Sequence, residues 1–219
     1  MDAVHLTTAH NSTDTRIFDK EAKSLADAGF EVGIIAHDAP ENPIDGVNFY
    51  SLGTATSRLE RWWNIAKAAR IAGGIEAEIY HIHDLELLPA GLYLSKATES
   101  AVIYDVHEDY GHIAPMRDWV RGSIAPLMSW AIPKIEQFAV GQFDVVVPVS
   151  EWIKEPFVDS VDNITVVHNS PRTEMIPEVS GRIDSTARCT LCYVGGLVDV
   201  RGIHRMLELL ACLLERGVD

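Results

Sequence analysis

The sequence predicts an α/β fold in which helices connect the strands of a parallel sheet. Short apolar runs alternate with segments of helical periodicity over almost the whole chain, which is the pattern of βαβ units. The 219 residues can bury the core of one large domain or of one and a half ordinary ones. A composition of 47% hydrophobic and 23% charged residues is typical of a soluble globular protein, and no apolar run is long enough to cross a bilayer.

Seven apolar runs of strand length form the predicted sheet. They are Ala3–Thr8, Glu31–Ala36, Val47–Ser51, Ile79–Ile82, Ala101–Val106, Val145–Val149 and Ile164–Val167. Helical periodicity between the runs predicts crossover helices. These helices cover residues 12–30, 58–72, 86–96 and 151–157.

The first of these helices has the clearest signals. Phe18, Ala22 and Leu25 fall on one helical face, and Ser, Thr and Asp residues at the start are candidates for its N-cap. Gly29 follows as a C′ residue, the position where glycine commonly ends a helix.

A later stretch, Met116–Val140, has helical periodicity but contains Pro126 and Pro133. Proline removes a backbone hydrogen bond and disturbs the helix around it, so two or three helical pieces with a bend are expected. Ser150 follows the sixth strand and is expected to cap the short helix after it.

The chain changes character after residue 172, where the first predicted domain ends. Residues 173–188 contain Pro, Gly, Ser and charges with no clear period, so they are interpreted as an interdomain linker. Residues 189–219 have the order strand, glycine turn, helix, and are predicted to begin a second α/β domain. One βα unit cannot bury both of its faces, so we expect a fragment or a naturally shortened chain.

The charge and the cysteines argue against several classes of protein. A formal charge of −14, from 32 acids and 18 bases, disfavours a general nucleic-acid binder, which needs a positive surface. The first residues show no secretory signal, so a cytoplasmic location is expected. Cys189, Cys192 and Cys212 are odd in number, which disfavours a disulfide framework, and buried strand cysteines are favoured over a redox or zinc pair.

Polar residues collect where the predicted strands end. Five loops that carry His, Asp, Asn, Ser or Arg follow strands, with the sequences AHNSTDTR, HIHDLE, DVHEDY, SEW and HNSPR. The carboxyl ends of parallel strands meet at one edge of a sheet, where such folds bind ligands. Five loops of this kind favour a functional rim over chance solvation.

Two of these loops raise the question of a metal site. His81 and His83 are two residues apart and would share a face of an extended strand, and His107 or a carboxylate could complete the ligands. The carboxylates concerned are Asp105, Glu108 and Asp109. The alternative is that each histidine is a neutral imidazole bonded to backbone at the start of a loop. The spacing is a weak signal, so no metal site is predicted.

Two turns suit phosphate groups. The helix after AHNST offers backbone N–H groups and the positive end of its dipole, and VGGLVDVRG lets the backbone approach an anion beside Arg201. Neither turn matches a phosphate-binding fingerprint, and Gly195 and Gly196 could simply form a tight turn between strand and helix.

The segment Arg58–Arg70 combines basic residues with Trp62 and Trp63. A basic aromatic helix of this kind can rest on the surface of an anionic membrane, which would give the protein a peripheral membrane contact. The alternative, which is favoured, is a crossover helix whose tryptophans pack in the core.

The order and spacing of six motifs resemble those of the family 4 retaining glycosyltransferases. The motifs are TTAHNSTDTRIFDKEAKSLADAGFEVGIIAHD, YHIHDLELLPAG, VIYDVHEDY, VVVPVSEWIK, VVHNSPR and YVGGLVDVRGI. The resemblance runs from about Val4 to Leu214 and covers the amino-terminal domain of that family and the first unit of its carboxyl-terminal domain. The set of motifs is specific to the family and does not specify a substrate.

That resemblance implies the GT-B architecture, in which two Rossmann-like domains face each other. The first domain mainly shapes the acceptor site, and the second mainly holds a nucleotide-sugar. The resemblance also implies the reaction, in which a sugar passes from a UDP- or GDP-sugar to a hydroxyl of a glycan or a lipid-linked acceptor. Configuration is retained in this reaction, and no metal ion or other cofactor is required.

The resemblance further implies roles for individual residues. His107 matches the family residue beside the reacting sugar and diphosphate, and Arg201 would neutralise the departing diphosphate. The other candidates for binding the donor phosphates are Asn11, Ser12, Thr13, Gly195 and Gly196, of which the two glycines stand where many relatives have Gly-Arg. The candidates for binding the acceptor or supporting the site are His83, Asp84, Asp105, Glu108, Asp109, Ser150 and Asn169.

The E-x7-E region of the family and its nucleotide-binding strands would lie beyond Asp219. Residues 1–219 alone are therefore expected to be incomplete for catalysis, and sugar transfer is expected of a full-length form. Two alternatives stay open. One is a non-catalytic acceptor-binding remnant or half-enzyme, and the other, less favoured, is a GT-B nucleotide-sugar epimerase.

Overall fold

The computed structural model describes residues 1–54, 58–113, 120, 124–173, 176, 191–197 and 201–217. The chain divides into two compact units, Met1–Met175 and Ile176–Asp219, and each is described by itself. Within the ranges given, no helix is long and apolar enough to span a membrane.

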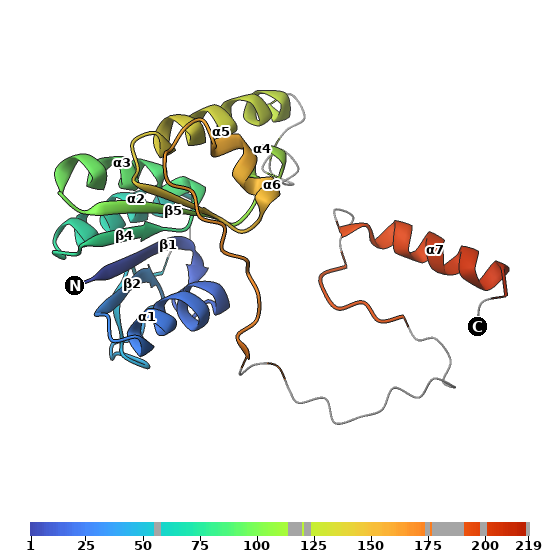
Figure 1. Ribbon diagram of the computed structural model, residues 1–219, viewed down its shortest axis with the longest axis horizontal. Coiled ribbons are helices and arrows are strands. Elements are labelled where there is room, and N and C mark those ends of the chain that lie inside the picture. The colour runs from blue at the N-terminus through green and yellow to red at the C-terminus, as the bar shows by residue number, and fades with distance from the viewer. Residues whose placement is uncertain are drawn as a thin grey trace. The chain divides into compact units, whose positions relative to one another are not determined.

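A parallel sheet of six strands forms the centre of the first unit, as the alternation of strand and helix patterns predicts. The strands are β1 (Ala3–Asn11), β2 (Val32–His37), β3 (Val47–Ser51), β4 (Ile79–Ile82), β5 (Ala101–Val106) and β6 (Val145–Pro148). Their order in the sheet is β3-β2-β1-β4-β5-β6, so the chain winds outward from β1 in both directions (Figure 1). This is the order of a Rossmann-like fold, and the predicted fold class is confirmed.

Helices cover both faces of the sheet. In the first unit they are η1 (Thr15–Ala22, a π-helical segment), α1 (Lys23–Asp27), α2 (Arg58–Gly73), η2 (Leu85–Leu87), α3 (Leu88–Ala97), α4 (Tyr110–Ile113), α5 (Ala125–Val140), α6 (Glu151–Lys154) and η4 (Glu155–Phe157). Figure 1 shows α2, α3 and α5 on one side of the sheet and α1 on the other. The helices predicted over residues 58–72, 86–96 and 151–157 are therefore confirmed within a few residues.

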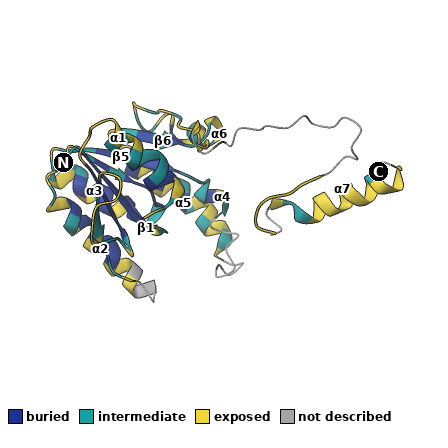
Figure 2. Ribbon diagram, turned by 90° about the horizontal axis from the view of Figure 1, so that it is seen from below, coloured by how far each residue is buried: buried dark blue, intermediate teal, exposed yellow. Residues whose placement is uncertain are grey.

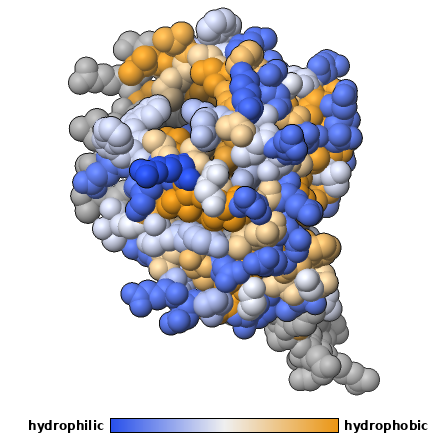
Figure 3. Space-filling view, turned by 90° about the vertical axis from the view of Figure 1, so that its left-hand side faces the viewer, coloured by the Kyte–Doolittle hydropathy of each residue, from blue (hydrophilic) through white to orange (hydrophobic). Residues whose placement is uncertain are grey.

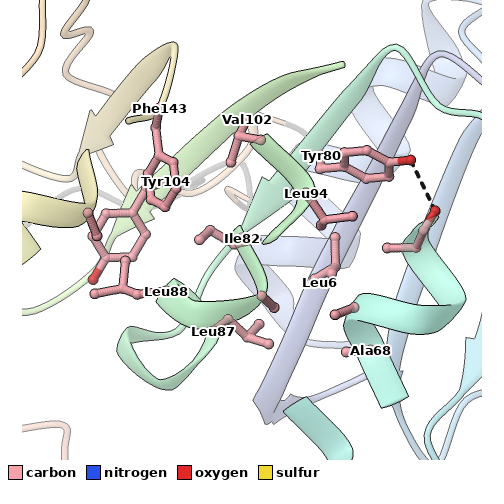
Figure 4. Close-up of a cluster of buried hydrophobic side chains, with 14 of the residues drawn as sticks. Leu6, Ala68, Tyr80, Ile82, Leu87, Leu88, Leu94, Val102, Tyr104 and Phe143 are labelled. Carbon is pink, nitrogen blue, oxygen red and sulfur yellow. Dashed lines mark hydrogen bonds between the residues drawn. The ribbon is translucent and has the colours of Figure 1, made fainter. Parts of the chain in front are cut away.

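The face of the sheet under α2, α3 and α5 is apolar. Alternate residues of a strand point to the same face, and on this face they are Val4, Leu6, Tyr80, Ile82, Val102 and Tyr104, all fully buried. Leu87, Leu88 and Leu94 pack against them from η2 and α3 (Figure 4). The hydroxyl of Tyr80 donates to the backbone oxygens of Ala72 and Ile75, at 3.0 and 2.8 Å. Figure 2 shows the buried residues in the sheet and on the inner sides of the helices.

The other face of the sheet is covered over β2 and β3 by η1 and α1. Ile17, Phe18 and Ala22 are buried there, and Leu25 packs against them, so the helical face predicted from the sequence is confirmed. Gly29 adopts a φ of +94°, a conformation that suits glycine, and follows the end of α1 as predicted.

The seventh predicted strand, Ile164–Val167, is wrong as a strand and forms a single bridge to Val146. The segment follows β6 through bonds from the N–H of Thr165 to Val146 O (3.1 Å) and from the N–H of Val167 to Pro148 O (3.0 Å). Pro148 has no N–H to donate in return, so the ladder cannot continue and the sheet ends at β6.

The break predicted at Pro133 is also wrong. α5 runs from Ala125 to Val140 with Pro133 inside it and Pro126 in its first turn, where proline is tolerated. Pro133 packs closely on Gly111 of α4, where an added Cβ would lie 2.7 Å from Pro133 Cγ. This contact packs α4 against α5 at the position of the missing hydrogen bond. Residues 114–119 and 121–123, where the rest of the predicted bend falls, lie outside the described residues.

Helix α7 (Ile203–Glu215) is the regular element of the described part of the second unit, and the helix predicted there is confirmed. Residues 191–194 were expected to belong to a strand but have no strand conformation, because no neighbouring strand pairs with them among the described residues of this unit. Cys192 is exposed, so the prediction that it is a buried strand cysteine is wrong, and Cys212 of α7 is exposed as well. Cys189 and residues 174, 175 and 177–188 of the predicted linker lie outside the described residues.

Trp62 and Trp63 of α2 are 69% and 75% exposed, so the favoured prediction that they pack in the core is wrong. The side chains of Arg58 and Arg61 lie outside the described residues. Membrane contact by this segment stays a prediction, which flotation with anionic vesicles tests.

On the face drawn in Figure 3, apolar patches lie between hydrophilic residues. The buried residues of α2 are Asn64, Ile65, Ala68, Ala69 and Ala72.

Candidate functional site

The carboxyl ends of β1, β4 and β5 bring three histidines and a carboxylate together. His10 Nε2 lies 3.5 Å from Asp84 Oδ1, and the rings of His10 and His107 are 5.6 Å apart between centroids. His83 Nδ1 and His107 Nε2 share a hydrogen bond of 3.2 Å. The structure therefore places the predicted site residues His83, Asp84 and His107 at one point of the rim.

His107 follows the last residue of β5, and its side chain is 12% exposed. Burial is the main cause that lowers its pKa to about 4, with a smaller contribution from His83, while Asp105 opposes the shift. The ring is therefore neutral at neutral pH. A neutral imidazole can both donate and accept a hydrogen bond, and the bond to His83 fixes the direction in which it does so.

Asp84 holds the end of β1 in place through hydrogen bonds to three successive residues. Its Oδ2 accepts hydrogen bonds from Thr7 Oγ1 (2.8 Å) and from the backbone N–H groups of Thr8 (2.6 Å) and Ala9 (3.1 Å). The side chain is almost fully buried, and its Oδ1 faces His10. Asp84 thus shapes the loop that carries His10.

Beneath the rim, on the η1 side of the sheet, lies a buried polar cluster. Its members are His5, Arg16, Glu21, His81, His83 and Asp105. Arg16 binds both oxygens of Asp105, with Nη2 at 2.9 Å from each and Nε at 3.1 Å from Oδ2. Arg16 Nε also lies 2.9 Å from Glu21 Oε1. Because Arg16 belongs to η1 and Asp105 to β5, their ion pair links η1 to the sheet.

The ionisation of the buried polar cluster follows from its burial. Burial lowers the pKa of His81 to about 3 and that of His5 well below its usual value, so both rings are neutral. Burial and the neighbouring Asp105 raise the pKa of Glu21 to about 9, against the effect of Arg16. The pKa of Asp105 is lowered by its bond to His83 and by the nearby imidazoles, although burial opposes this. Asp105 therefore carries the negative charge that Arg16 neutralises.

Two groups of side chains in the described residues could hold a metal ion. One is His5, Glu21, His81 and His83, and the other is His83, Asp105 and His107. Within each group the ligand atoms lie within 4.8 Å of one another.

The family model described as Glycosyltransferase Family 4 matches residues 16–174, which is well over half of the chain. The chain belongs to glycosyltransferase family 4. The matched residues include Arg16 and Glu21 of η1, the rim residues that follow β4 and β5, and the loop after β6.

Solved structures agree with this fold. A sucrose-phosphate synthase from Thermosynechococcus elongatus is similar to the family 4 chain with a TM-score of 0.54 and 12% identity, over 77% of this chain and 48% of that one. A shorter structure of the same enzyme gives a TM-score of 0.52 and 11% identity, over 77% and 90%. The match thus spans about half the length of the longer synthase. No curated protein sequence matches.

The predicted donor turn after β1 of the family 4 chain is partly occupied by its own carboxylate. Asp14 accepts from the backbone N–H groups of Arg16 (2.8 Å) and Ile17 (3.1 Å), and so takes the place that an anion would have at the start of η1. Asn11 is exposed and borders a pocket of about 310 Å³, whereas Ser12 is buried and donates to Asp38 O at 3.2 Å. Phosphate binding by Asn11, Ser12 and Thr13 stays a prediction.

The second unit brings its predicted phosphate-binding residues together. Gly195 has a φ of +153°, which residues with a side chain rarely adopt, and a Cβ added to it would lie 2.9 Å from Arg201 Nη1. Tyr193 Oη donates to Gly196 O at 2.9 Å and closes the turn. Arg201 therefore lies against the glycine turn, as the motif predicts.

The remaining predicted residues of the family 4 site have structural partners. Asp109 caps α4 by accepting from His112 N at 3.1 Å, and Ser150 caps α6 by accepting from Ile153 N at 3.3 Å, as the sequence predicts for Ser150. Asn169 accepts from Lys20 Nζ at 2.6 Å. Glu108 borders a pocket of about 200 Å³ at the carboxyl end of β5, whose lining includes Tyr110, Gly111, Pro133 and Glu136.

Sequence reasoning missed His5, His10, Arg16 and Glu21 as site residues. His5 interrupts an apolar run, and a polar residue in a strand that is otherwise buried is a signal that could have been used. Arg16 and Glu21 are five residues apart, which places them on different faces of an α-helix. In the π-helical η1, where bonds join residues i and i+5, they point the same way.

Proposed function

We propose that the chain is the acceptor-side domain, with the start of the donor-side domain, of a retaining glycosyltransferase. The donor is a UDP- or GDP-sugar, and the acceptor is a hydroxyl of a glycan or of a lipid-linked saccharide. The transfer itself needs no metal ion. The observation that carries the proposal is the position of His107, a neutral imidazole held by His83 at the rim of a family 4 domain.

The two units each supply groups suited to this reaction. At the rim of the first unit, the neutral His107 can accept a hydrogen bond from a hydroxyl of the donor sugar or donate one to its diphosphate. The carboxylates of Glu108 and Asp109 suit acceptor hydroxyls. In the second unit, Arg201 carries a charge that suits the departing diphosphate. The acceptor oxygen bonds to the anomeric carbon on the face that the diphosphate leaves, and its proton passes to a diphosphate oxygen beside it.

Sugar transfer by His107→Ala and His168→Ala variants of the full-length form tests the proposal. His168 is the control because it is an exposed imidazole whose Nδ1 bonds to the backbone oxygen of Val149 at 3.0 Å. The full-length form is incubated with UDP- and GDP-sugars and a glycan panel, products are detected by mass spectrometry, and the anomeric configuration is read by NMR. We expect His107→Ala to lower turnover by about 100-fold or more while His168→Ala stays near wild type.

Each other outcome contradicts a stated part of the proposal. Unchanged turnover in a folded His107→Ala variant would remove the role of His107, and a product of inverted configuration would exclude retention. Conversion of the donor without an acceptor product would indicate the epimerase. Saturable glycan binding with no donor turnover would indicate the acceptor-binding remnant.

A further inference from the structure

We infer that His5, His83 and Glu21, with His81 as a fourth ligand, form a binding site for one divalent transition-metal ion of the zinc class. The site lies in the buried polar cluster, between the sheet and η1. The ion has no part in the sugar transfer proposed above. Its place in the fold indicates that it fastens η1 to β1 and β4.

The topology explains why these ligands meet. β1 and β4 are neighbouring parallel strands, and His5 stands opposite His81 in their register. His83 comes two residues after His81 and returns to the same face of the sheet. Glu21 reaches this face from η1, and its carboxylate lies beside His5 of β1 and His83 after β4.

The distances fit one ion. His5 Nδ1 and His83 Nε2 share a hydrogen bond of 2.9 Å, which an ion between them would replace, and Glu21 Oε2 lies 3.9 Å from the first and 3.8 Å from the second. A point equidistant from three atoms with these separations lies about 2.1 Å from each, which is the length of a zinc bond to nitrogen or carboxylate oxygen. His81 offers a ligand atom within 4.8 Å of the others, so it can complete a four-coordinate set.

The chemistry of the donor set selects the class of ion. Imidazole nitrogen with carboxylate oxygen suits zinc, cobalt or nickel, whereas calcium and magnesium are held by oxygen ligands. Buried polar atoms normally have partners, yet Glu21 Oε2 and the Nε2 atoms of His5 and His81 are buried with no hydrogen-bond partner among the described residues. A metal ion gives a partner to the carboxylate oxygen and to His81.

The surrounding groups are those that orient metal ligands. Arg16 Nε lies 2.9 Å from Glu21 Oε1, which leaves Oε2 to face the two imidazoles. The second nitrogen of His83, Nδ1, bonds to His107 Nε2 at 3.2 Å and lies 3.5 Å from Asp105 Oδ2. A hydrogen-bond partner and a carboxylate behind a metal-bound histidine fix the orientation of the ring.

The site can be reached without unfolding. A pocket of about 450 Å³ opens on the η1 side of the sheet, and its lining includes His5, Glu21 and His81 among apolar residues such as Leu25 and Ile103. The pocket leads to Glu21 and His81, whose side chains are 14% and 13% exposed, while His5 and His83 lie fully buried beside them.

Zinc binding to the metal-free protein tests this inference. After dialysis against a chelator, zinc is titrated by calorimetry, and the metal content is measured after gel filtration. We expect one zinc per chain, with affinity at least about 100-fold lower in His81→Ala and Glu21→Gln, because each lacks a ligand. Glu21→Gln keeps an oxygen for Arg16. His168→Ala, which removes an exposed imidazole, should bind as wild type.

A measurement on the wild type alone covers the case in which the variants do not fold. ¹⁵N spectra of histidine side chains, recorded with and without zinc, should show shifts of the imidazoles of His5, His81 and His83. Shifts confined to His10, His112, His168 or His204, or affinity unchanged in both ligand variants, would overturn the inference. So would a folded wild type that retains no zinc. These results leave sugar transfer untouched, so the two proposals fail separately.

Discussion

On the side of α2, α3 and α5, the sheet buries Leu6 and Ile82 among apolar neighbours, and on the side of η1 the same strands bury His5, His83 and Asp105 just as completely. The apolar side gains free energy in proportion to area, and many side chains of the right size could fill it. The polar side is stable only if each group has its partner in the right place. The comparison shows that one side of this sheet can accept many apolar substitutions, whereas the other side requires specific polar partners.

The largest effect is expected from breaking the polar side at Asp105. Asp105→Ala leaves the guanidinium of Arg16 buried without its partner, so the free energy of unfolding should fall by about 3–5 kcal/mol in urea denaturation. The exposed pair of Asp27 and Arg172, at 3.4 Å, is a matched control in the same unit. Asp27→Ala should change stability by no more than about 1 kcal/mol. Equal effects of the two variants would contradict the contrast between buried and exposed pairs.

A slightly smaller effect is expected from the apolar side. Leu6 is fully buried under α2 and α3, so Leu6→Ala should lower the free energy of unfolding by about 2–5 kcal/mol through lost burial and the cavity that remains. Leu127 of α5 is 58% exposed, and Leu127→Ala should stay within about 0.5 kcal/mol of wild type. Urea denaturation measures both. A loss below about 1 kcal/mol at Leu6 would show that this side rearranges around the missing atoms.

The smallest effect concerns Glu136, a carboxyl buried on the apolar side. It accepts a hydrogen bond of 2.9 Å from the hydroxyl of Tyr104. Burial, with a smaller effect of Asp109, raises its pKa from 4.5 to about 7, although the bond from Tyr104 opposes the shift. The folded state therefore binds the proton more tightly than the unfolded state does. Its contribution to stability is present at low pH and is lost as the pH rises from about 4.5 to about 7.

Thermal unfolding of Glu136→Gln between pH 5 and pH 8 checks this sign. At pH 8 the variant should be more stable than wild type by at most about 3 kcal/mol, because glutamine keeps the oxygen acceptor and carries no charge to bury. The difference should shrink toward pH 5. Glu99→Gln, at an exposed position on the loop before β5, should show no such trend. A difference that grows as the pH falls would refute a raised pKa.

The apolar side of the fold was largely predictable from the sequence. Strand alternation in β1, β4 and β5 and the helical face of Phe18 and Ala22 are local patterns, and the structure confirms them. Two local rules failed. Pro133 continues a helix because α4 supports it, and the segment after Ile164 fails as a strand because its partner, Pro148, has no N–H.

The rim was predictable in part, because polar loops at the ends of parallel strands must meet at one edge. His83, Asp84, Asp105 and His107 do come together there. The cluster beneath the rim was not predicted as a whole. His5 was overlooked in an apolar run, and Arg16 and Glu21 were assigned to a regular α-helix that would separate them.

The sequence by itself determined the family, the parallel sheet and the edge at which its polar loops gather, because periodicity and motif order are written along the chain. Only the tertiary structure decided that η1 is π-helical and that Arg16 and Glu21 reach across β1 to Asp105 and the histidines. Contacts between residues as far apart as Arg16 and Asp105 depend on strand order and register, which no local pattern contains.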